Sequence, residues 1–312
     1  MQQQFPEQRP NPITPPRTIT PFSVPAVTTS SRLRFPLSQH ELAARVRQAL
    51  DEDSAFNDVT TIATVVSSRH ARAKLVARQD GTIAGIPLAL ESFRQLDPKI
   101  SIRVDAEDGQ AVSRGATVLF LTGHARGLLS AERTALNFMQ RLSGIASLTA
   151  RYVAAVRGTR AKILDTRKTT PGWRSLEKYA VRAGGGTNHR MDLADSVLIK
   201  DNHLRAVDGD VKLAIRRTRE LEPNARVEIE CDNVEQVRAA LDAKADIILL
   251  DNMALEEMRD CVAVVAGRAL VEASGGVHLD RVRSIAETGV DYISVGALTH
   301  SPPAMNLALD FE

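Results

Sequence analysis

The chain has few aromatic residues and almost no excess charge. Phe, Tyr and Trp make up 4% of its 312 residues, and 40 basic residues nearly balance 38 acidic ones, which leaves a net charge of +2. Single-stranded nucleic acids are bound by stacking on aromatic rings, and most nucleic-acid surfaces carry a clear basic excess. We therefore expect no nucleic-acid partner.

Cysteine is scarce, and long apolar runs are missing. Cys231 and Cys261 lack the spacing of metal ligands, so we interpret them as reduced, small apolar side chains. No apolar stretch approaches the ~20 residues that a membrane-spanning helix needs. An apolar content of 43% with 25% charged residues is typical of a soluble globular protein. These features favour a cytoplasmic protein with no membrane partner.

Proline is unevenly placed, because seven of the 14 prolines lie within the first 25 residues. Such a segment cannot bury enough apolar surface to offset the entropy of ordering it, so residues 1–34 are predicted to be a disordered tail. A secretory signal is not indicated, since no basic segment leads into an apolar core. A transit peptide remains an alternative because Glu7 is the single acidic residue of the tail, although the prolines oppose the amphipathic helix that such a peptide forms.

The region 35–142 is predicted to be a small α+β domain. Two strand-like runs, 73–78 and 82–86, flank the turn 79–81 and are typical of a β-hairpin. Apolar periodicity predicts helices before and after the strands. The other expected elements are a helix at 37–50, strands at 100–104 and 118–121, and a long helix at 129–156.

From residue 161 onward, short apolar strands alternate with helical stretches. Strands buried on both faces and joined by helices imply parallel βα units. Six strands suit an α/β barrel slightly smaller than the usual eight-stranded one over residues 143–299, and a doubly wound open sheet is the alternative. Dinucleotide-binding and nucleoside-triphosphate loops are not found after any strand. The expected strands are 162–165, 196–200, 226–231, 246–251, 269–273 and 291–295; the expected helices are 175–182, 211–221, 234–241, 255–266 and 279–286.

Basic residues follow two of the predicted strands. Arg167 and Lys168 come after the first strand and Lys200 ends the second. In α/β barrels the carboxyl ends of the strands build the active site. The positive end of the helix dipole disfavours a cation at a helix N-terminus, so these residues are not simple helix caps. They indicate an anionic ligand.

Glycine-rich turns accompany these cations. Ser274-Gly275-Gly276 and Gly296 close the last two strands, where backbone N–H groups can bind a phosphate. The run Gly184-Gly185-Gly186 suggests a loop that passes close to a ligand, and His189-Arg190 follows it. Arginine is suited to gripping a carboxylate with two parallel hydrogen bonds.

Carboxylates complete the predicted site. Glu230 and Asp251 lie at the ends of the third and fourth strands. They can hold a divalent metal, bind ribose hydroxyls or stabilise developing positive charge; a structural ion-pair network is the alternative. At least four cations with a phosphate cradle call for a polyanionic pair of substrates.

These motifs resemble the quinolinate phosphoribosyltransferase family over about residues 40–312. The resemblance lies in seven segments whose order and length are specific. They are Glu132-Arg133-Thr134-Ala135-Leu136-Asn137 with Leu142-Ser143-Gly144-Ile145-Ala146, Asp165-Thr166-Arg167-Lys168-Thr169-Thr170-Pro171-Gly172, Gly184-Gly185-Gly186-Thr187-Asn188-His189-Arg190, Leu198-Ile199-Lys200-Asp201-Asn202-His203, Val227-Glu228-Ile229-Glu230-Cys231-Asp232 and Glu272-Ala273-Ser274-Gly275-Gly276-Val277.

The resemblance implies an N-terminal α/β sandwich beside an incomplete α/β barrel of six or seven strands, of the type II phosphoribosyltransferase kind, with residues 300–312 returning to the sandwich. It implies a homodimer with a shared active site, and higher oligomers stay open. It also implies a reaction in which quinolinate and 5-phosphoribosyl 1-diphosphate give nicotinate mononucleotide, diphosphate and carbon dioxide, with Mg²⁺ and no organic cofactor. This is a step of de novo NAD biosynthesis.

Roles follow from the resemblance by position. Arg133 is expected to reach quinolinate from the neighbouring subunit, and Lys168 to lie near the diphosphate and ribose. Glu230 and Asp251 are expected to contact the ribose hydroxyls or the metal, directly or through water. The quinolinate pocket is expected to contain Thr166, Arg167, His189, Arg190 and Lys200. The 5-phosphate is expected to bind Ser274, Gly275, Gly276 and Gly296, with His300.

Three alternatives remain open at this point. A nicotinate-specific phosphoribosyltransferase would need fewer cations, because its substrate has one carboxylate, and a molybdate-associated relative would share the fold. A catalytically silent phosphoribosyl-binding protein would be expected to lack Lys168 or Glu230. The chain departs from the family in its acidic segment 51–61, where a glycine is often found, and no expected ligand contact lies there.

Overall fold

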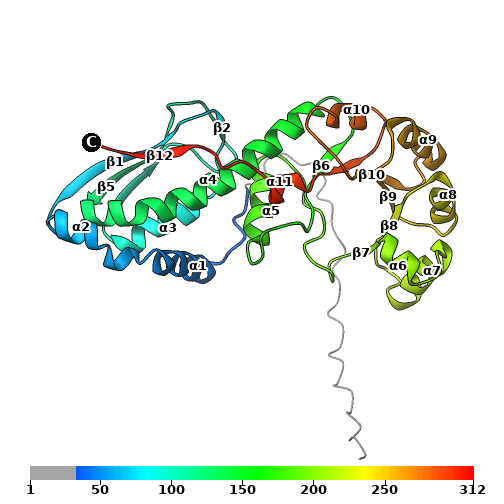
Figure 1. Ribbon diagram of the computed structural model, residues 1–312, viewed down its shortest axis with the longest axis horizontal. Helices are drawn as coiled ribbons and strands as arrows, with labels where there is room; N and C mark the ends of the chain where they lie inside the picture. Colours follow the sequence, from blue (N-terminus) through cyan, green and yellow to red (C-terminus); the bar gives the residue numbers. More distant parts are fainter. Residues whose placement is uncertain (1–32) are drawn as a thin grey trace, which may run out of the picture.

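The computed structural model describes residues 33–312 (Figure 1). Apart from Leu33 and Arg34, the predicted disordered tail lies outside the described residues. Among those residues, none of the helices combines the length and the hydrophobicity needed to cross a membrane. The first half contains α1 (Gln39–Glu52), α2 (Val59–Thr64), β1 (His70–Ala77), β2 (Gly81–Thr82), α3 (Ile86–Leu96), β3 (Ser101–Val104), β4 (Ala111–Val112), β5 (Thr117–His124) and α4 (Ala125–Ala155).

An antiparallel sheet in the order β12-β1-β5-β3 forms one layer of the N-terminal half, and β12 (Leu307–Phe311) is the last strand of the chain. Side chains of the sheet pack against α3 and α4, with Phe93 and Met139 fully buried between the layers. Figure 1 shows these helices on one face of the sheet. Two layers around one apolar core confirm the predicted sandwich.

The predicted hairpin at residues 73–86 is wrong. β1 pairs with β5 and with β12, whereas β2 pairs with β4. Gly85 has φ +101°, and α3 begins directly after it with Pro87 in its first turn, so residue 86 starts a helix. The turn signal at 79–81 was local, but the strands found partners far away in the sequence. The antiparallel register of residue 75 with residue 309 cannot be read from a turn.

Six parallel strands form the second half in the order β6-β11-β10-β9-β8-β7. After β6, the strands run in reverse chain order from β11 to β7. The edge strands are therefore β6 and β7, and the barrel is open between them. A parallel bridge between Leu164 and Thr187 lies at the β6 edge. The strands are β6 (Lys162–Leu164), β7 (Val197–Ile199), β8 (Val227–Cys231), β9 (Ile247–Asp251), β10 (Leu270–Ser274) and β11 (Tyr292–Ser294).

Helices cover the outside of this barrel (Figure 1). They are α5 (Arg174–Ala183), α6 (Asp201–Arg205), α7 (Val211–Leu221), α8 (Val234–Asp242), α9 (Leu255–Val265), α10 (Val282–Ala286) and α11 (Ala297–His300). Side chains of β8 show why: Val227, Ile229 and Cys231 are fully buried against the helices. The incomplete barrel is therefore confirmed, and the open doubly wound sheet is not. The division between the halves at residue 142 stays a prediction, because α4 runs across it.

Candidate active site

Acidic residues of β8 point into the barrel. Because side chains alternate along a strand, Glu228 and Glu230 lie on the face opposite Val227 and Ile229. Both carboxylates are nearly buried, with 4% and 8% of their surface exposed. Buried charges require partners, so each must meet a cation, a proton or a ligand inside the barrel.

Lys200 supplies the partner for Glu230. Its ammonium group donates a hydrogen bond of 2.8 Å to Glu230 Oε2. Asp251 stands at the end of the neighbouring strand β9, where burial and then the negative charge of Glu230 raise its pKa. Two carboxylates that repel each other, of which only Glu230 is paired with Lys200, provide hard oxygen ligands, which suit a divalent cation such as Mg²⁺.

A strained turn follows β10. Gly275 and Gly276 have φ values of +85° and +55°, in the left-handed region that favours glycine. A Cβ on Gly275 would lie 2.2 Å from Asn252 Oδ1, and Asn252 itself has φ +53° and donates a 2.7 Å hydrogen bond to Asp251. Ser274 pairs with Asp251 across β10 and β9. The glycine turn and the carboxylates therefore lie side by side.

Lys168, Gly296 and His300 meet at the neighbouring corner of the barrel. A Cβ on Gly296 would lie 3.1 Å from Lys168 Cδ and 3.3 Å from the His300 ring. The Lys168 side chain is exposed, and its backbone N–H donates to Thr166 Oγ1 at 3.1 Å. An exposed lysine above a glycine is accessible to a ligand.

Arg167 and Arg190 bring two guanidinium groups close together. Arg190 is 7% exposed and donates to the Ser196 carbonyl at 3.0 Å. Burial, followed by the positive charge of Arg167, lowers its pKa. Arg167 Nε is buried and has no hydrogen-bond partner among residues 33–312. An unpaired buried donor beside a second cation indicates an anion that binds both.

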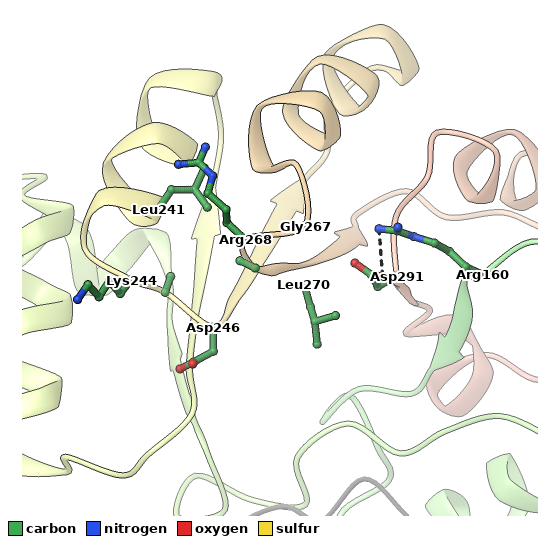
Figure 2. Close-up of a pocket in the computed structure, with 10 residues that line it drawn as sticks. Arg160, Leu241, Lys244, Asp246, Gly267, Arg268, Leu270 and Asp291 are labelled. Carbon is green, nitrogen blue, oxygen red and sulfur yellow. Dashed lines mark ion pairs between the residues drawn. The ribbon is translucent and has the colours of Figure 1, made fainter. Parts of the chain in front are cut away.

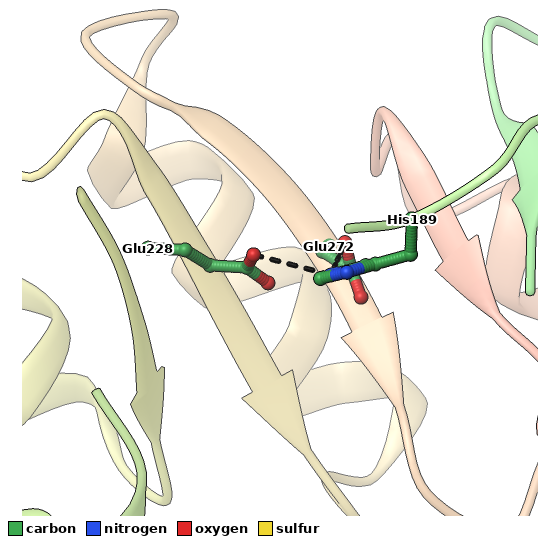
Figure 3. A group of neighbouring side chains, drawn as sticks. All are labelled: His189, Glu228 and Glu272. Carbon is green, nitrogen blue, oxygen red and sulfur yellow. Dashed lines mark ion pairs between the residues drawn. The ribbon is translucent and has the colours of Figure 1, made fainter. Parts of the chain in front are cut away.

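His189 lies against two carboxylates, as Figure 3 shows. Its Nε2 atom is 3.2 Å from Glu228 and 3.7 Å from Glu272, while Nδ1 accepts the Arg190 backbone N–H at 2.8 Å. Burial, and then the charge of Glu228, raise the pKa of Glu272 to about 8. Burial opposes charge on His189, but the Glu228 hydrogen bond and Glu272 together raise its pKa.

These three groups could hold a metal ion, because their ligand atoms lie within 4.8 Å of one another. The raised pKa of Glu272 favours the neutral form of this carboxyl, which lowers the negative charge that faces His189 without a metal ion, and the Ser294 hydroxyl bonds to it. A cavity of about 110 Å³ adjoins the group inside the barrel. We call Arg167, His189, Arg190 and Lys200 the cationic cup.

Arg133 does not belong to this cup within one chain. It is exposed on α4, eight residues before Arg141, whose side chain reaches the Thr299 carbonyl at 2.6 Å. Eight helical residues span about 12 Å, at about 1.5 Å per residue. Arg133 therefore lies well along α4 from the point where that helix touches the barrel.

Another pocket, of about 670 Å³, lies elsewhere (Figure 2). It is lined by residues at the amino ends of the strands, including Asp246 and Leu270, and Arg160 pairs there with Asp291 at 3.0 Å. Barrel enzymes place their chemistry at the carboxyl ends, where the predicted residues gather. Size alone is thus a poor guide to the site in this protein.

Several residues of the site were not among the predicted ones. Glu228 could have been found, because strand alternation places it on the same face as Glu230. In the same way, strand alternation places Glu272 on the same face of β10 as the predicted Ser274. Asn252 follows Asp251 at the end of the fourth predicted strand, but its contact with the turn after β10 depends on a left-handed backbone that the sequence does not show.

Comparisons with known proteins agree with this geometry. Residues 145–310 match the family described as quinolinate phosphoribosyl transferase, C-terminal domain, and residues 58–143 match the N-terminal domain of the same family. The nicotinate-nucleotide pyrophosphorylase (carboxylating) of Mycobacterium leprae is 45% identical over 273 residues, which cover 85% of this chain and 95% of that protein.

Solved structures give the same result. The nicotinate-nucleotide pyrophosphorylase of Francisella tularensis is 38% identical with a TM-score of 0.83, covering 89% of this chain and 99% of that chain. The enzyme of the same name from Ehrlichia chaffeensis is 40% identical with a TM-score of 0.83, covering 88% and 99%. The resemblance of the sequence motifs is confirmed, and the chain belongs to the quinolinate phosphoribosyltransferase family.

Proposed function

We propose that this chain transfers a phosphoribosyl group from 5-phosphoribosyl 1-diphosphate to quinolinate, with loss of carbon dioxide, and so forms nicotinate mononucleotide for NAD biosynthesis. The enzyme is a pentosyltransferase. The observation that carries the proposal is the cationic cup. In it, Arg167 lies close enough to Arg190 for its charge to lower the pKa of Arg190, and the buried Arg167 Nε has no hydrogen-bond acceptor among residues 33–312. A dicarboxylate supplies acceptors for more cations than the single carboxylate of nicotinate does.

The first stage joins the two substrates. The quinolinate nitrogen attacks the anomeric carbon of ribose, the bond to diphosphate breaks, and positive charge develops on the sugar. Glu230 and Asp251 stabilise that charge, because they are fixed carboxylates in a site of limited solvent access. Lys168 offsets the charge of the departing diphosphate, and the Ser274-Gly275-Gly276 turn with Gly296 and His300 binds the 5-phosphate.

The second stage removes a carboxyl group. Once the ring nitrogen carries a positive charge, the adjacent C–C bond breaks, carbon dioxide leaves, and the electron pair remains on the ring carbon until a proton replaces the carboxylate. Arg167, Arg190 and Lys200 hold the substrate, and His189 and Thr166 line its pocket. The protein mainly positions two anions that repel each other, so no covalent nucleophile is needed.

Mg²⁺ is proposed to bind with the phosphoribosyl diphosphate. The donor set of Glu230 and Asp251 fits it, because both offer oxygen atoms, and a cation would offset the burial and the repulsion from Glu230 that raise the pKa of Asp251. The ion would neutralise diphosphate charge. The pair lies at the ends of adjacent strands beside the glycine turn, where a bound diphosphate can share the cation.

A homodimer is proposed to complete the site with Arg133 of a second copy. About one turn before Arg133 on α4, the Ser130 hydroxyl donates to Asp58, the N-cap of α2, at 2.9 Å, and α2 exposes Val59 and Ile62. Exposed apolar residues beside an exposed arginine are expected at a subunit contact. We also propose a cytoplasmic location, which the two free, buried cysteines support.

The proposal is tested by steady-state kinetics of two variants. Arg167→Ala and Arg133→Ala should each raise the KM for quinolinate at least tenfold, because each removes a charge-assisted hydrogen bond worth about 1.5–3 kcal/mol. Wild-type kinetics in either variant would remove that residue from the site.

Subunit exchange tests the shared site. Arg133→Ala and Lys168→Ala variants, assayed at a quinolinate concentration so low that each alone has little activity, should recover activity once mixed and allowed to exchange, if one site draws on two chains. A mixture that exchanges subunits and stays inactive would contradict the shared site.

A further inference from the structure

Helix α5 carries two adjacent charged side chains, Glu177 and Lys178, that are both fully buried. Acidic and basic residues are almost never fully buried without partners. Neighbouring residues on a helix point about 100° apart, since a turn holds 3.6 residues. The two side chains therefore reach different segments of the protein.

Glu177 fixes the loop that carries Arg167 and Lys168. Its carboxylate accepts the Thr170 backbone N–H at 3.1 Å, the Thr170 hydroxyl at 2.8 Å and the Arg141 guanidinium at 2.7 Å. Thr170 lies two residues after Lys168. The loop is thus tied to α5 and to α4.

Arg141 extends this network to α11. It also donates to the Thr299 carbonyl at 2.6 Å, and the Thr299 hydroxyl donates to the Lys168 carbonyl at 2.8 Å. Gly296 and His300 stand at the two ends of the same short helix. Glu177 and Arg141 therefore set how far Lys168 lies from the proposed phosphate site.

Lys178 fixes the other cationic segment. Its ammonium group bonds to the Asp165 carboxylate and donates to the His189 carbonyl at 2.9 Å. Asp165 in turn accepts the His189 backbone N–H at 2.8 Å and bonds to the Asn188 amide. The backbone N–H and the carbonyl of His189 are both held, which fixes the direction in which His189 and Arg190 enter the barrel.

Stability alone does not account for these charges. Buried ion pairs lose much of their Coulomb energy to desolvation, and well-packed apolar residues often replace them without loss of stability. Apolar side chains could fill the same space, but they could not accept the Thr170 N–H or donate to the His189 carbonyl. The charges supply direction, which packing does not.

We propose that Glu177 and Lys178 are positioning residues for the two substrates: Glu177 places the Lys168 side of the site for phosphoribosyl diphosphate, and Lys178 places His189 and Arg190 for quinolinate. This inference rests on the proposed function. A small displacement of a binding group has a large effect, because about 1 Å can cost about a hundredfold in rate.

The test is the ratio of two Michaelis constants. Glu177→Gln keeps the size of the side chain but places an amide donor where N–H and O–H donors converge. It should raise the KM for phosphoribosyl diphosphate relative to that for quinolinate about tenfold. The double variant Asp165→Asn/Lys178→Met removes both buried charges together, and it should shift the ratio about tenfold the opposite way.

Controls separate positioning from stability. Glu220→Gln removes an exposed carboxylate of an i,i+4 pair on α7 and should leave both constants unchanged. Thr170→Val deletes one donor to Glu177 at an exposed position, so it tests the same contact even if Glu177→Gln does not fold; it should move the ratio about threefold in the same direction.

Opposite shifts of the KM ratio support the inference, since a loss of folded enzyme lowers kcat and leaves both KM values unchanged. An unchanged ratio in the folded variants, or an equal rise of both constants, would overturn it. A wild-type enzyme inactive with these substrates would instead overturn the proposed function.

Discussion

Gly275 should tolerate alanine much less well than its neighbour Gly276. Both residues have positive φ, +85° and +55°, so an alanine at either position costs roughly 1–2 kcal/mol of backbone strain. Only at Gly275 does the new Cβ collide, at 2.2 Å from Asn252 Oδ1; at Gly276 that atom is 3.9 Å away. Overpacking adds about 1–3 kcal/mol, so Gly275→Ala should lose about 2–5 kcal/mol in all.

The collision can be isolated with a double-mutant cycle. Thermal unfolding should place Gly275→Ala several degrees below Gly276→Ala, since 1 kcal/mol shifts the midpoint of a domain of this size by about 2–4 °C. Asn252→Gly removes the colliding amide, so Gly275→Ala/Asn252→Gly should regain about 1–3 kcal/mol relative to additivity. Equal melting temperatures for the two alanine variants, or strict additivity in the cycle, would refute this reasoning.

Three further predictions concern charge. Lys200→Met should raise the KM for quinolinate more than tenfold, because it removes a charged donor worth about 1.5–3 kcal/mol, and it should also lower the melting temperature, because it leaves the buried Glu230 carboxylate without its cation. For Glu272, the folded-state pKa lies at about 8, above its usual 4.5, so its contribution to stability falls as pH rises through that window; urea titrations should show Glu272→Gln gaining on the wild type between those pH values, and parallel curves would contradict this. Chelation of divalent cations should abolish turnover and Mg²⁺ should restore it, and Asp251→Asn should need more Mg²⁺ for half-maximal rate; a chelated enzyme that keeps its rate would exclude the metal.

The parallel half of the fold was readable because its rules are local. Strands buried on both faces and amphipathic helices alternate along the chain, and the predicted helix at 211–221 matches α7 at both ends. In the N-terminal half, β1 pairs with a strand more than 230 residues later, so neighbouring sequence carried no sign of its partner.

The site was readable only in part, for a related reason. A cation at a strand end, where a helix begins, is disfavoured by the helix dipole. Arg167, Lys168 and Lys200 could therefore be predicted from the sequence as ligand-binding residues. Glu177 and Lys178 break no rule in sequence, since charged residues in a helix are usually exposed. Their burial follows from the packing of α5 against two loops, which only the folded chain reveals.

The account is tested most directly by a product assay. Purified protein with quinolinate, 5-phosphoribosyl 1-diphosphate and Mg²⁺ should form nicotinate mononucleotide, diphosphate and carbon dioxide in equal amounts, and nicotinate should not replace quinolinate. Arg167→Ala serves as the control and should form far less product at the same substrate concentrations. Nicotinate mononucleotide formed from nicotinate, or no product from quinolinate, would contradict the assignment of the cationic cup to a dicarboxylate.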